Sequence, residues 1–191
     1  MSPDGSNFRS AKLVLADGTI YSGSAFGADT VRAGEVVFNT SMTGYQEMLT
    51  DPSYAGQIVV PTYPLIGNYG INERDFESRR VQVAGFAVRE HSTRPSHSMS
   101  TATLDEFLAS QGVAGIGGID TRAVTRRLRT SGVMMGAITL DPSPQSVLTR
   151  LREFPSYADT DFVKSVTTEQ HYDWSQPAHG QDTAAITRKI V

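Results

Sequence analysis

Short apolar runs separated by turn residues recur along the chain and predict β-strands. They lie at residues 11–15, 19–26, 34–40, 57–62, 81–88, 114–116 and 136–140. The pair Asp17-Gly18 falls between the first two runs and is typical of a tight turn, so these runs predict a β-hairpin. Pro61 interrupts the fourth run, so that strand either lies at a sheet edge or stops there, since proline cannot donate a ladder hydrogen bond.

Other segments have helical character and begin and end at suitable residues. They lie at residues 43–49, 103–111, 121–130 and 145–153, with one further turn at 161–166. Thr103 and Glu106 form a capping-box pattern. Asp120 is placed to cap the third helix, and Gly132 to end it. Strands fill the first half and alternate with helices in the second, so the sequence predicts a mixed α/β domain.

The composition of the chain limits which binding partners and which cellular compartment we expect. The 191 residues carry a net charge of -3, which argues against a nucleic-acid or anionic-membrane partner. The chain has no cysteine, so disulfides, zinc–cysteine sites and a cysteine nucleophile are excluded within these residues. Residues 1–10 are polar and resemble no signal peptide, and no apolar run is long enough to span a membrane. We therefore expect a cytoplasmic protein.

A search for catalytic and metal-ligating patterns finds no self-sufficient site. No two histidines have the helical i, i+4 spacing of a metal pair; the four are His91, His97, His171 and His179. The segment at 115–120 (GIGGID) lies between a strand and a helix, where phosphate loops occur, but it lacks the glycine pattern and the lysine of such loops. It predicts a close strand-to-helix turn. From its residues alone, the chain is expected to be a binding or interaction module without a self-sufficient catalytic site.

Several long blocks resemble one known family. Residues 34–54 read GEVVFNTSMTGYQEMLTDPSY, residues 57–68 read QIVVPTYPLIGN, and residues 118–138 read GIDTRAVTRRLRTSGVMMGAI. These blocks and the segments between them are similar to the N-terminal domain of the small subunit of glutamine-hydrolysing carbamoyl-phosphate synthase. The resemblance covers residues 11–174.

The resemblance implies a fold, a reaction and partners. The family's ligase makes carbamoyl phosphate from glutamine, bicarbonate and ATP for arginine and pyrimidine synthesis. Its small subunit joins a swivelling β/β/α-type domain, which docks to the large subunit, to a class I glutamine amidotransferase domain with a cysteine, a histidine and a glutamate. ATP and a divalent metal are expected on the large subunit, and no cofactor is expected in this chain.

The resemblance also divides the chain. Residues 1–10 are expected to be a disordered N-terminus, and residues 11–174 to form the small-subunit domain. Residues 175–191 are expected to be a linker and the first strand of an amidotransferase domain. The catalytic residues of that second domain are absent from the 191 residues, so this chain is expected to be a fragment that is inactive alone.

One functional residue is implied by the resemblance. In the family, the serine of the DPSY turn contacts the glutamine bound by the neighbouring domain; here it is Ser53. The simpler interpretation is a turn serine that caps backbone groups. Flanking residues are weaker candidates: Thr40, Ser41, Thr43, Gly44 and Tyr45. We expect the loop at 63–69 and the basic helix around Arg126 to contribute to docking on the large subunit.

Two other functions stay open at this point. One is a free-standing, non-catalytic binding module that has kept this fold. The other is an unrelated hydrolase that uses Ser53 or a histidine, which is weaker because no base lies near Ser53 in the sequence.

Overall fold

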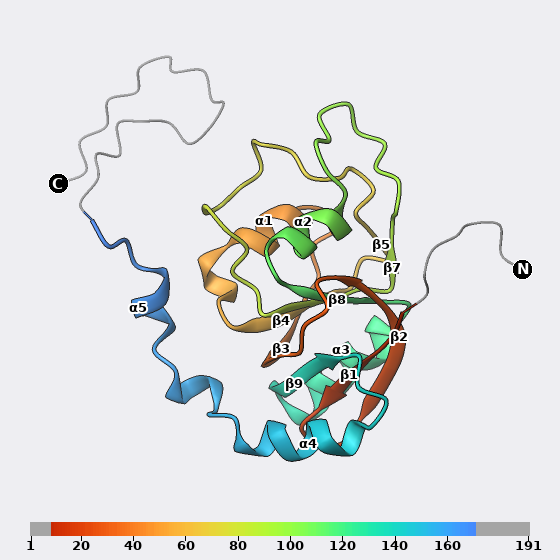
Figure 1. Cartoon of the computed structure of the whole chain (residues 1–191), viewed down its shortest axis with the longest axis vertical. Helices are drawn as coiled ribbons and strands as arrows, with labels where there is room; N and C mark the ends of the chain where they lie inside the picture. Colours follow the sequence, from red (N-terminus) through yellow and green to blue (C-terminus); the bar gives the residue numbers. More distant parts are fainter. Residues whose placement is uncertain (1–8, 171–191) are drawn as a thin grey trace, which may run out of the picture.

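The computed structural model describes residues 9–170 (Figure 1). Seven strands of this part of the chain close into a barrel in the order β1-β2-β8-β6-β4-β3-β9. Their bounds are Ser10–Leu15 (β1), Ile20–Gly27 (β2), Arg32–Asn39 (β3), Gln57–Pro61 (β4), Gly85–Ala87 (β6), Ala114–Gly117 (β8) and Met134–Thr139 (β9). A separate two-stranded sheet pairs Leu65–Ile66 (β5) with Glu90–His91 (β7).

The described residues also form five α-helices and two short 3-10 helices, and α4, η2 and α5 follow the last strand. The α-helices are Tyr45–Thr50 (α1), Leu104–Ser110 (α2), Thr121–Ser131 (α3), Pro144–Glu153 (α4) and Phe162–Val166 (α5), and the 3-10 helices are Pro52–Tyr54 (η1) and Tyr157–Asp159 (η2). Figure 1 shows α1 and α2 together on one side of the sheet, with α4 on the opposite side. The mixed α/β architecture is confirmed. None of the helices in residues 9–170 has the length and apolar character needed to cross a bilayer.

The predicted hairpin is confirmed. β1 and β2 pair antiparallel up to Val14 and Ile20, and the turn between them is closed by a bond from the Gly18 amide to the Leu15 carbonyl at 2.9 Å. Gly18 has a φ of 90°, a conformation that glycine adopts without steric cost. The carboxylate of Asp17 accepts a bond from the Thr19 amide at 2.8 Å, which fixes the turn further.

β4 stops at Pro61, as predicted, but the alternative of an edge position is wrong. The strand is part of the barrel wall, paired in parallel with β3 on one side and with β6 on the other. Ile58, Val59 and Val60 are all fully buried. Proline is accommodated because it occupies the last position, opposite Asn39, where the ladder ends.

The strand predicted at 81–88 is shorter in the structure. The strand comprises Gly85–Ala87, and ahead of it the Gln82 amide donates to the Leu49 carbonyl near the end of α1 (2.8 Å). β5 and β7 lie outside the runs that predict strands, since strands of two residues carry no periodic pattern.

The alternation of side chains along the strands builds two core layers. Ile58 and Val60 belong to a cluster supplied by all the barrel strands, which α3 joins through Val124 and Leu128. Val59, between them, faces a second cluster outside the barrel, which α1 and α2 cover. The barrel therefore carries α1 on a rigid support, and the segment that follows α1 contains Ser53.

The predicted helix caps are present. The Thr103 side chain and the Glu106 carboxylate form both bonds of the capping box at the start of α2. Asp120 accepts a bond from the Ala123 amide at 2.9 Å at the start of α3, and Gly132 follows its last residue. The segment at 115–120 is thus the close strand-to-helix turn that the sequence predicts.

Two predicted regions fall largely outside the described residues. Residues 1–8 and 171–191, which include most of the predicted N-terminal segment and the predicted linker and strand at 175–191, are not described. The proposed domain boundaries therefore stay predictions.

Candidate functional site

Ser53 lies in the middle of η1, directly after α1, and its turn is capped by another residue. The carboxylate of Asp51 accepts a bond from the Ser53 amide at 2.8 Å, and Pro52 occupies the first position of η1. The Ser53 side chain is exposed, and within residues 9–170 its hydroxyl makes no hydrogen bond. Ser53 therefore caps no backbone group of the described chain, and its hydroxyl is available to a ligand.

The turn is held in place from two sides. The Asn39 side-chain amide at the end of β3 donates to the Tyr54 hydroxyl at 2.8 Å. On the other side, the Tyr157 hydroxyl donates to the carbonyl of the buried Ala55 at 3.0 Å. Tyr54 and Ala55, the two residues after Ser53, are thus tied to other parts of the chain, which fixes the backbone of the turn.

A pair of stacked tyrosines supports the helix that leads to Ser53. The rings of Tyr45 and Tyr69 lie 4.1 Å apart between centroids. The Tyr69 hydroxyl accepts bonds from the amides of Gly44 (3.1 Å) and Tyr45 (3.0 Å), which satisfies donors at the helix start that a capping side chain would otherwise serve. The Tyr45 hydroxyl donates to the Gly70 carbonyl at 2.6 Å. Burial raises the pKa of both hydroxyls above the usual value for tyrosine, so both stay protonated.

The weaker candidates divide into two groups. Gly44 and Tyr45 belong to the support just described, and Gly44 has the φ of 86° that the helix start requires. Thr40, Ser41 and Thr43 are exposed. Ser41 and Thr43 line a pocket of about 90 Å³, together with Met42, Tyr45, Met48, Tyr63, Leu65, Ile66, Asn68 and Tyr69. Ser53 does not line this pocket, so the structure does not bring all six candidates to one place.

Glu47 is a notable residue that the sequence does not reveal. It lies on α1, and its Oε2 atom is buried without a hydrogen-bond partner in the described part of the chain. Burial raises the pKa of this carboxyl, and the negative charges of Asp75 and Glu77 raise it further. A single glutamate in a short helix gives no signal in the sequence that its carboxylate is buried.

The two histidines within residues 9–170, His91 and His97, form no metal site. His91 stacks on Phe26 with parallel rings 4.4 Å apart, while His97 lies in an exposed loop and accepts a bond from the Met99 amide. In the described residues, no group of three or more histidine, aspartate or glutamate side chains is placed to hold a metal ion. His91 is better explained as a partly buried aromatic side chain.

The pH dependence of stability should report on His91. Burial lowers the pKa of His91 below 6.5, although the charge of Asp105 opposes the shift. The unfolded chain then binds more protons near pH 6.5 than the folded domain, so the contribution of His91 is complete above pH 6.5 and is lost as the pH falls through the folded-state pKa. Between pH 8 and pH 5, urea unfolding should therefore show a larger loss of stability in the unmodified chain than in His91→Phe.

The comparison with His91→Phe isolates this effect from Glu47. Because the pKa of Glu47 is raised, its protonation favours the folded state at low pH and acts in the opposite direction. Glu47 is present in both proteins, so it cancels in the difference. Equal pH profiles for the two proteins would contradict the assignment.

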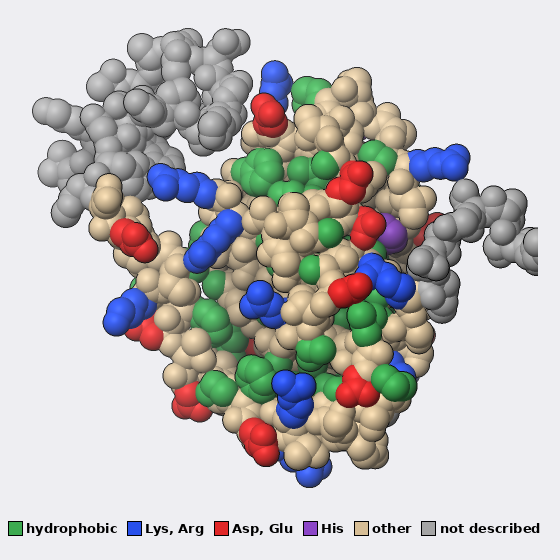
Figure 2. Space-filling view, viewed as in Figure 1, with side chains coloured by type: hydrophobic (Ala, Val, Ile, Leu, Met, Phe, Trp, Pro, Cys, Tyr) green, Lys and Arg blue, Asp and Glu red, His purple; other side chains and the backbone are tan. Residues whose placement is uncertain are grey.

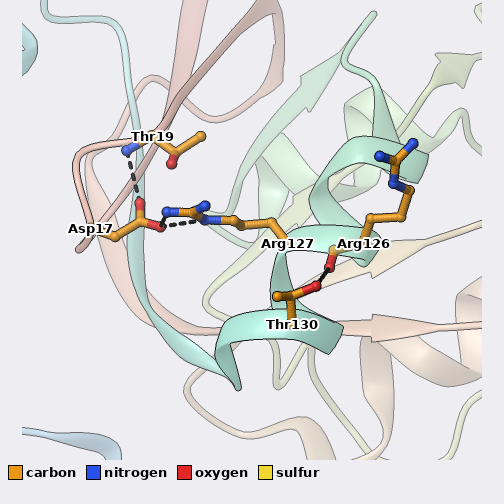
Figure 3. A network of polar contacts seen from close by, with 5 residues as sticks. All are labelled: Asp17, Thr19, Arg126, Arg127 and Thr130. Atoms are coloured by element: carbon orange, nitrogen blue, oxygen red, sulfur yellow. Dashed lines mark hydrogen bonds and ion pairs between the residues drawn. The ribbon is translucent and has the colours of Figure 1, made fainter.

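The predicted basic helix, α3, presents most of its arginines to solvent. Figure 3 shows Arg127 reaching Asp17 of the hairpin turn, with Nε and Nη2 2.7 Å and 2.6 Å from one carboxylate oxygen, while Arg126 extends away from this pair. Burial alone would raise the pKa of Asp17, but the bonds from Thr19 and Arg127 outweigh it and hold the pKa below its usual value.

The other three arginines of α3 lie on one side of the helix. Arg122, Arg126 and Arg129 are separated by four and three residues, are exposed, and make no ion pair within residues 9–170. We call these three residues the arginine ridge. On the face of the molecule that Figure 2 shows, by contrast, charged side chains of both signs are scattered between small apolar patches.

Comparison with known proteins gives a consistent family. The family model described as "Carbamoyl-phosphate synthase small chain, CPSase domain" matches residues 13–138. The carbamoyl phosphate synthase small chain of Syntrophotalea carbinolica is 52% identical over 167 residues, covering 87% of this chain and 44% of the relative. That of Fusobacterium nucleatum is 56% identical over 143 residues (74% and 40%), and that of Aquifex aeolicus 48% over 169 residues (88% and 46%).

The chain spans less than half the length of the curated relatives it matches. Among solved structures, an aminopeptidase from Aneurinibacillus sp. strain AM-1 matches with a TM-score of 0.41 and 14% identity, covering 68% of this chain and 30% of the other, a similarity too low to support an inference. The family match over residues 13–138 does not depend on it, and the chain belongs to the carbamoyl-phosphate synthase small chain family.

Proposed function

We propose that this chain is the N-terminal part of the small subunit of glutamine-dependent carbamoyl-phosphate synthase, a swivelling β/β/α-type domain that presents Ser53 to glutamine and docks on the large subunit. The observation that carries the glutamine role is the exposed Ser53 hydroxyl, unbonded within residues 9–170, on a turn that Asp51 caps. The family match and the relatives' printed names support the identity of the enzyme.

The chemistry of this role is recognition. A hydroxyl donates one hydrogen bond and accepts others, so Ser53 is able to bind the carboxylate, ammonium or amide groups of glutamine. Because the turn is already fixed through Tyr54 and Ala55, little order has to be gained on binding. The 191 residues contain no cysteine, so they do not supply the cysteine nucleophile of glutamine hydrolysis.

The remaining chemistry belongs to other parts of the proposed enzyme. A cysteine, a histidine and a glutamate of the amidotransferase part would release ammonia from glutamine. ATP and a divalent metal would bind the large subunit. We therefore expect the 191 residues alone to be inactive.

The hydrolase alternative gains no support from the site. Within residues 9–170, the Ser53 hydroxyl has no hydrogen bond to a histidine or a carboxylate, and Asp51 is engaged with the Ser53 amide. A serine nucleophile needs an adjacent base. The glutamine role is tested by Ser53→Ala in the full-length small subunit, with the glutamine KM and the ammonia-driven rate as the two quantities compared.

The proposed docking surface includes the arginine ridge. Like charges at these spacings destabilise an isolated helix, so three unpaired arginines on one side suit an acidic surface of another protein. The loop at 63–69 adds Tyr63, which is 39% exposed and lines the same pocket as Met42, which is 74% exposed. The arginine ridge would supply charged contacts and the loop apolar ones, the two kinds that protein interfaces combine.

Reversing the charge of the arginine ridge should weaken docking. Replacing Arg122, Arg126 and Arg129 with glutamate in the full-length small subunit should lower its affinity for the large subunit by roughly three- to a hundredfold, since each exposed pair is worth about 0.2–1 kcal/mol. The measurement is calorimetric titration at low and high salt, and the difference should shrink at high salt.

A matched variant controls for net charge. Arg32, Arg74 and Arg152 are exposed arginines outside α3, and their replacement with glutamate makes the same change in total charge. Equal affinities of the two triple variants would remove the ridge from the interface.

A further inference from the structure

Residues 155–166, which we call the strap, return the chain from α4 to the side of the barrel that carries η1. Figure 1 shows this segment in blue along the edge of the molecule, ending in α5. Most of its side chains are exposed, but Tyr157 and Phe162 are half-buried. Since these two side chains turn inward, they hold the strap on the body of the domain.

Both aromatic residues contact the segment directly after Ser53. The Tyr157 hydroxyl donates to the Ala55 carbonyl at 3.0 Å, and the Tyr157 and Phe162 rings stack with centroids 4.6 Å apart. The Phe162 ring covers Gly56 so closely that a Cβ atom there would lie 2.2 Å from two ring carbons. Gly56 also has a φ of 74°, so this position requires glycine for two independent reasons.

Two further contacts anchor the strap. The Arg80 guanidinium donates to the Ser165 carbonyl at 3.0 Å, which ties α5 to the segment before β6. Asp161 caps α5 through the Lys164 amide at 3.1 Å, so Phe162 projects from an ordered helical turn. The helix α5, which carries Phe162, is therefore fixed at both of its ends.

The strap fixes one end of the Ser53 turn. The Ala55 amide donates to the Pro52 carbonyl at 3.1 Å and closes η1, while the Ala55 carbonyl is bound by Tyr157. Asn39 holds the turn through Tyr54. The backbone on the C-terminal side of Ser53 thus depends on residues about a hundred positions later in the chain.

We propose that Tyr157 and Phe162 are positioning residues for the glutamine site, which act by holding the Ser53 turn in its binding geometry. This inference rests on the proposed function. Both residues act through the backbone after Ser53: Tyr157 binds the Ala55 carbonyl, and Phe162 covers Gly56. Loss of either contact frees the backbone after Ser53 and raises the cost of ordering the turn when glutamine binds.

The test measures glutamine kinetics in the full-length small subunit assembled with its large subunit. Tyr157→Phe removes only the hydroxyl, and Phe162→Ala removes the ring over Gly56. Each should raise the glutamine KM by about two- to tenfold and leave ammonia-driven synthesis unchanged. Val163→Ala is the matched control, because Val163 neighbours Phe162 but is 73% exposed; its glutamine KM should be unchanged.

The double variant Ser53→Ala/Phe162→Ala separates positioning from general stability. If the strap acts through Ser53, the double variant should have the same glutamine KM as Ser53→Ala alone. A KM unchanged in both strap variants, or a Phe162→Ala effect that persists in full without the Ser53 hydroxyl, would overturn the inference. The proposed function fails separately, if Ser53→Ala itself leaves the KM unchanged.

Discussion

Replacing Ser53 with alanine should raise the glutamine KM of the full-length enzyme by about two- to tenfold, because a neutral hydrogen bond contributes about 0.5–1.5 kcal/mol. Ammonia-driven synthesis should be unchanged, since ammonia bypasses the glutamine site. The expectation follows from an exposed hydroxyl that binds nothing within residues 9–170. Steady-state rates with each nitrogen donor provide the measurement.

The stability of the domain should not change in this variant. Asp51 caps the turn, so loss of the Ser53 hydroxyl should alter the free energy of unfolding by less than about 0.5 kcal/mol. Ser98→Ala, in an exposed loop, is the matched control for the loss of one serine hydroxyl. A lowered melting temperature with an unchanged glutamine KM would return Ser53 to a structural role.

Replacing Tyr45 with alanine should lower the free energy of unfolding by about 3–5 kcal/mol. Tyr45 is 2% exposed and stacks on Tyr69, so removal of its ring leaves a cavity under the start of α1. It also leaves the Gly70 carbonyl without its bond from the Tyr45 hydroxyl. Tyr45→Phe, which loses only that bond, should cost about 1–3 kcal/mol.

Urea unfolding of the two variants measures these costs. Tyr63→Ala serves as the control, because Tyr63 is 39% exposed on the neighbouring loop and should cost less than the buried tyrosine. If Tyr45→Ala unfolds at the same urea concentration as Tyr63→Ala, the stacked pair does not support α1.

The elements that the sequence predicts correctly are those with local causes. Asp17-Gly18 closes the hairpin, and Thr103 with Glu106 starts α2, through bonds that span only a few residues. The closure of the barrel has no such local cause. Parallel pairing of β3, β4 and β6 depends on contacts between segments far apart in sequence, which the apolar run at 57–62 cannot reveal.

The same contrast holds for the candidate site. The sequence around Ser53 predicts a turn, because Asp51 and Pro52 are typical turn residues. The role of Ser53 is implied by a family resemblance. Its surroundings are not predictable in this way, since Tyr157 reaches Ala55 across 102 residues and Tyr69 reaches Tyr45 across 24. Pairings at such distances emerge only from the folded chain.

The most direct test of the proposed glutamine role is a crystal structure of the full-length small subunit, its nucleophilic cysteine replaced by alanine, with L-glutamine bound. The account predicts that Ser53 Oγ lies within hydrogen-bonding distance, about 2.5–3.2 Å, of a polar atom of the glutamine. A bound glutamine whose polar atoms are all satisfied by other residues, with the Ser53 hydroxyl facing solvent, would contradict it.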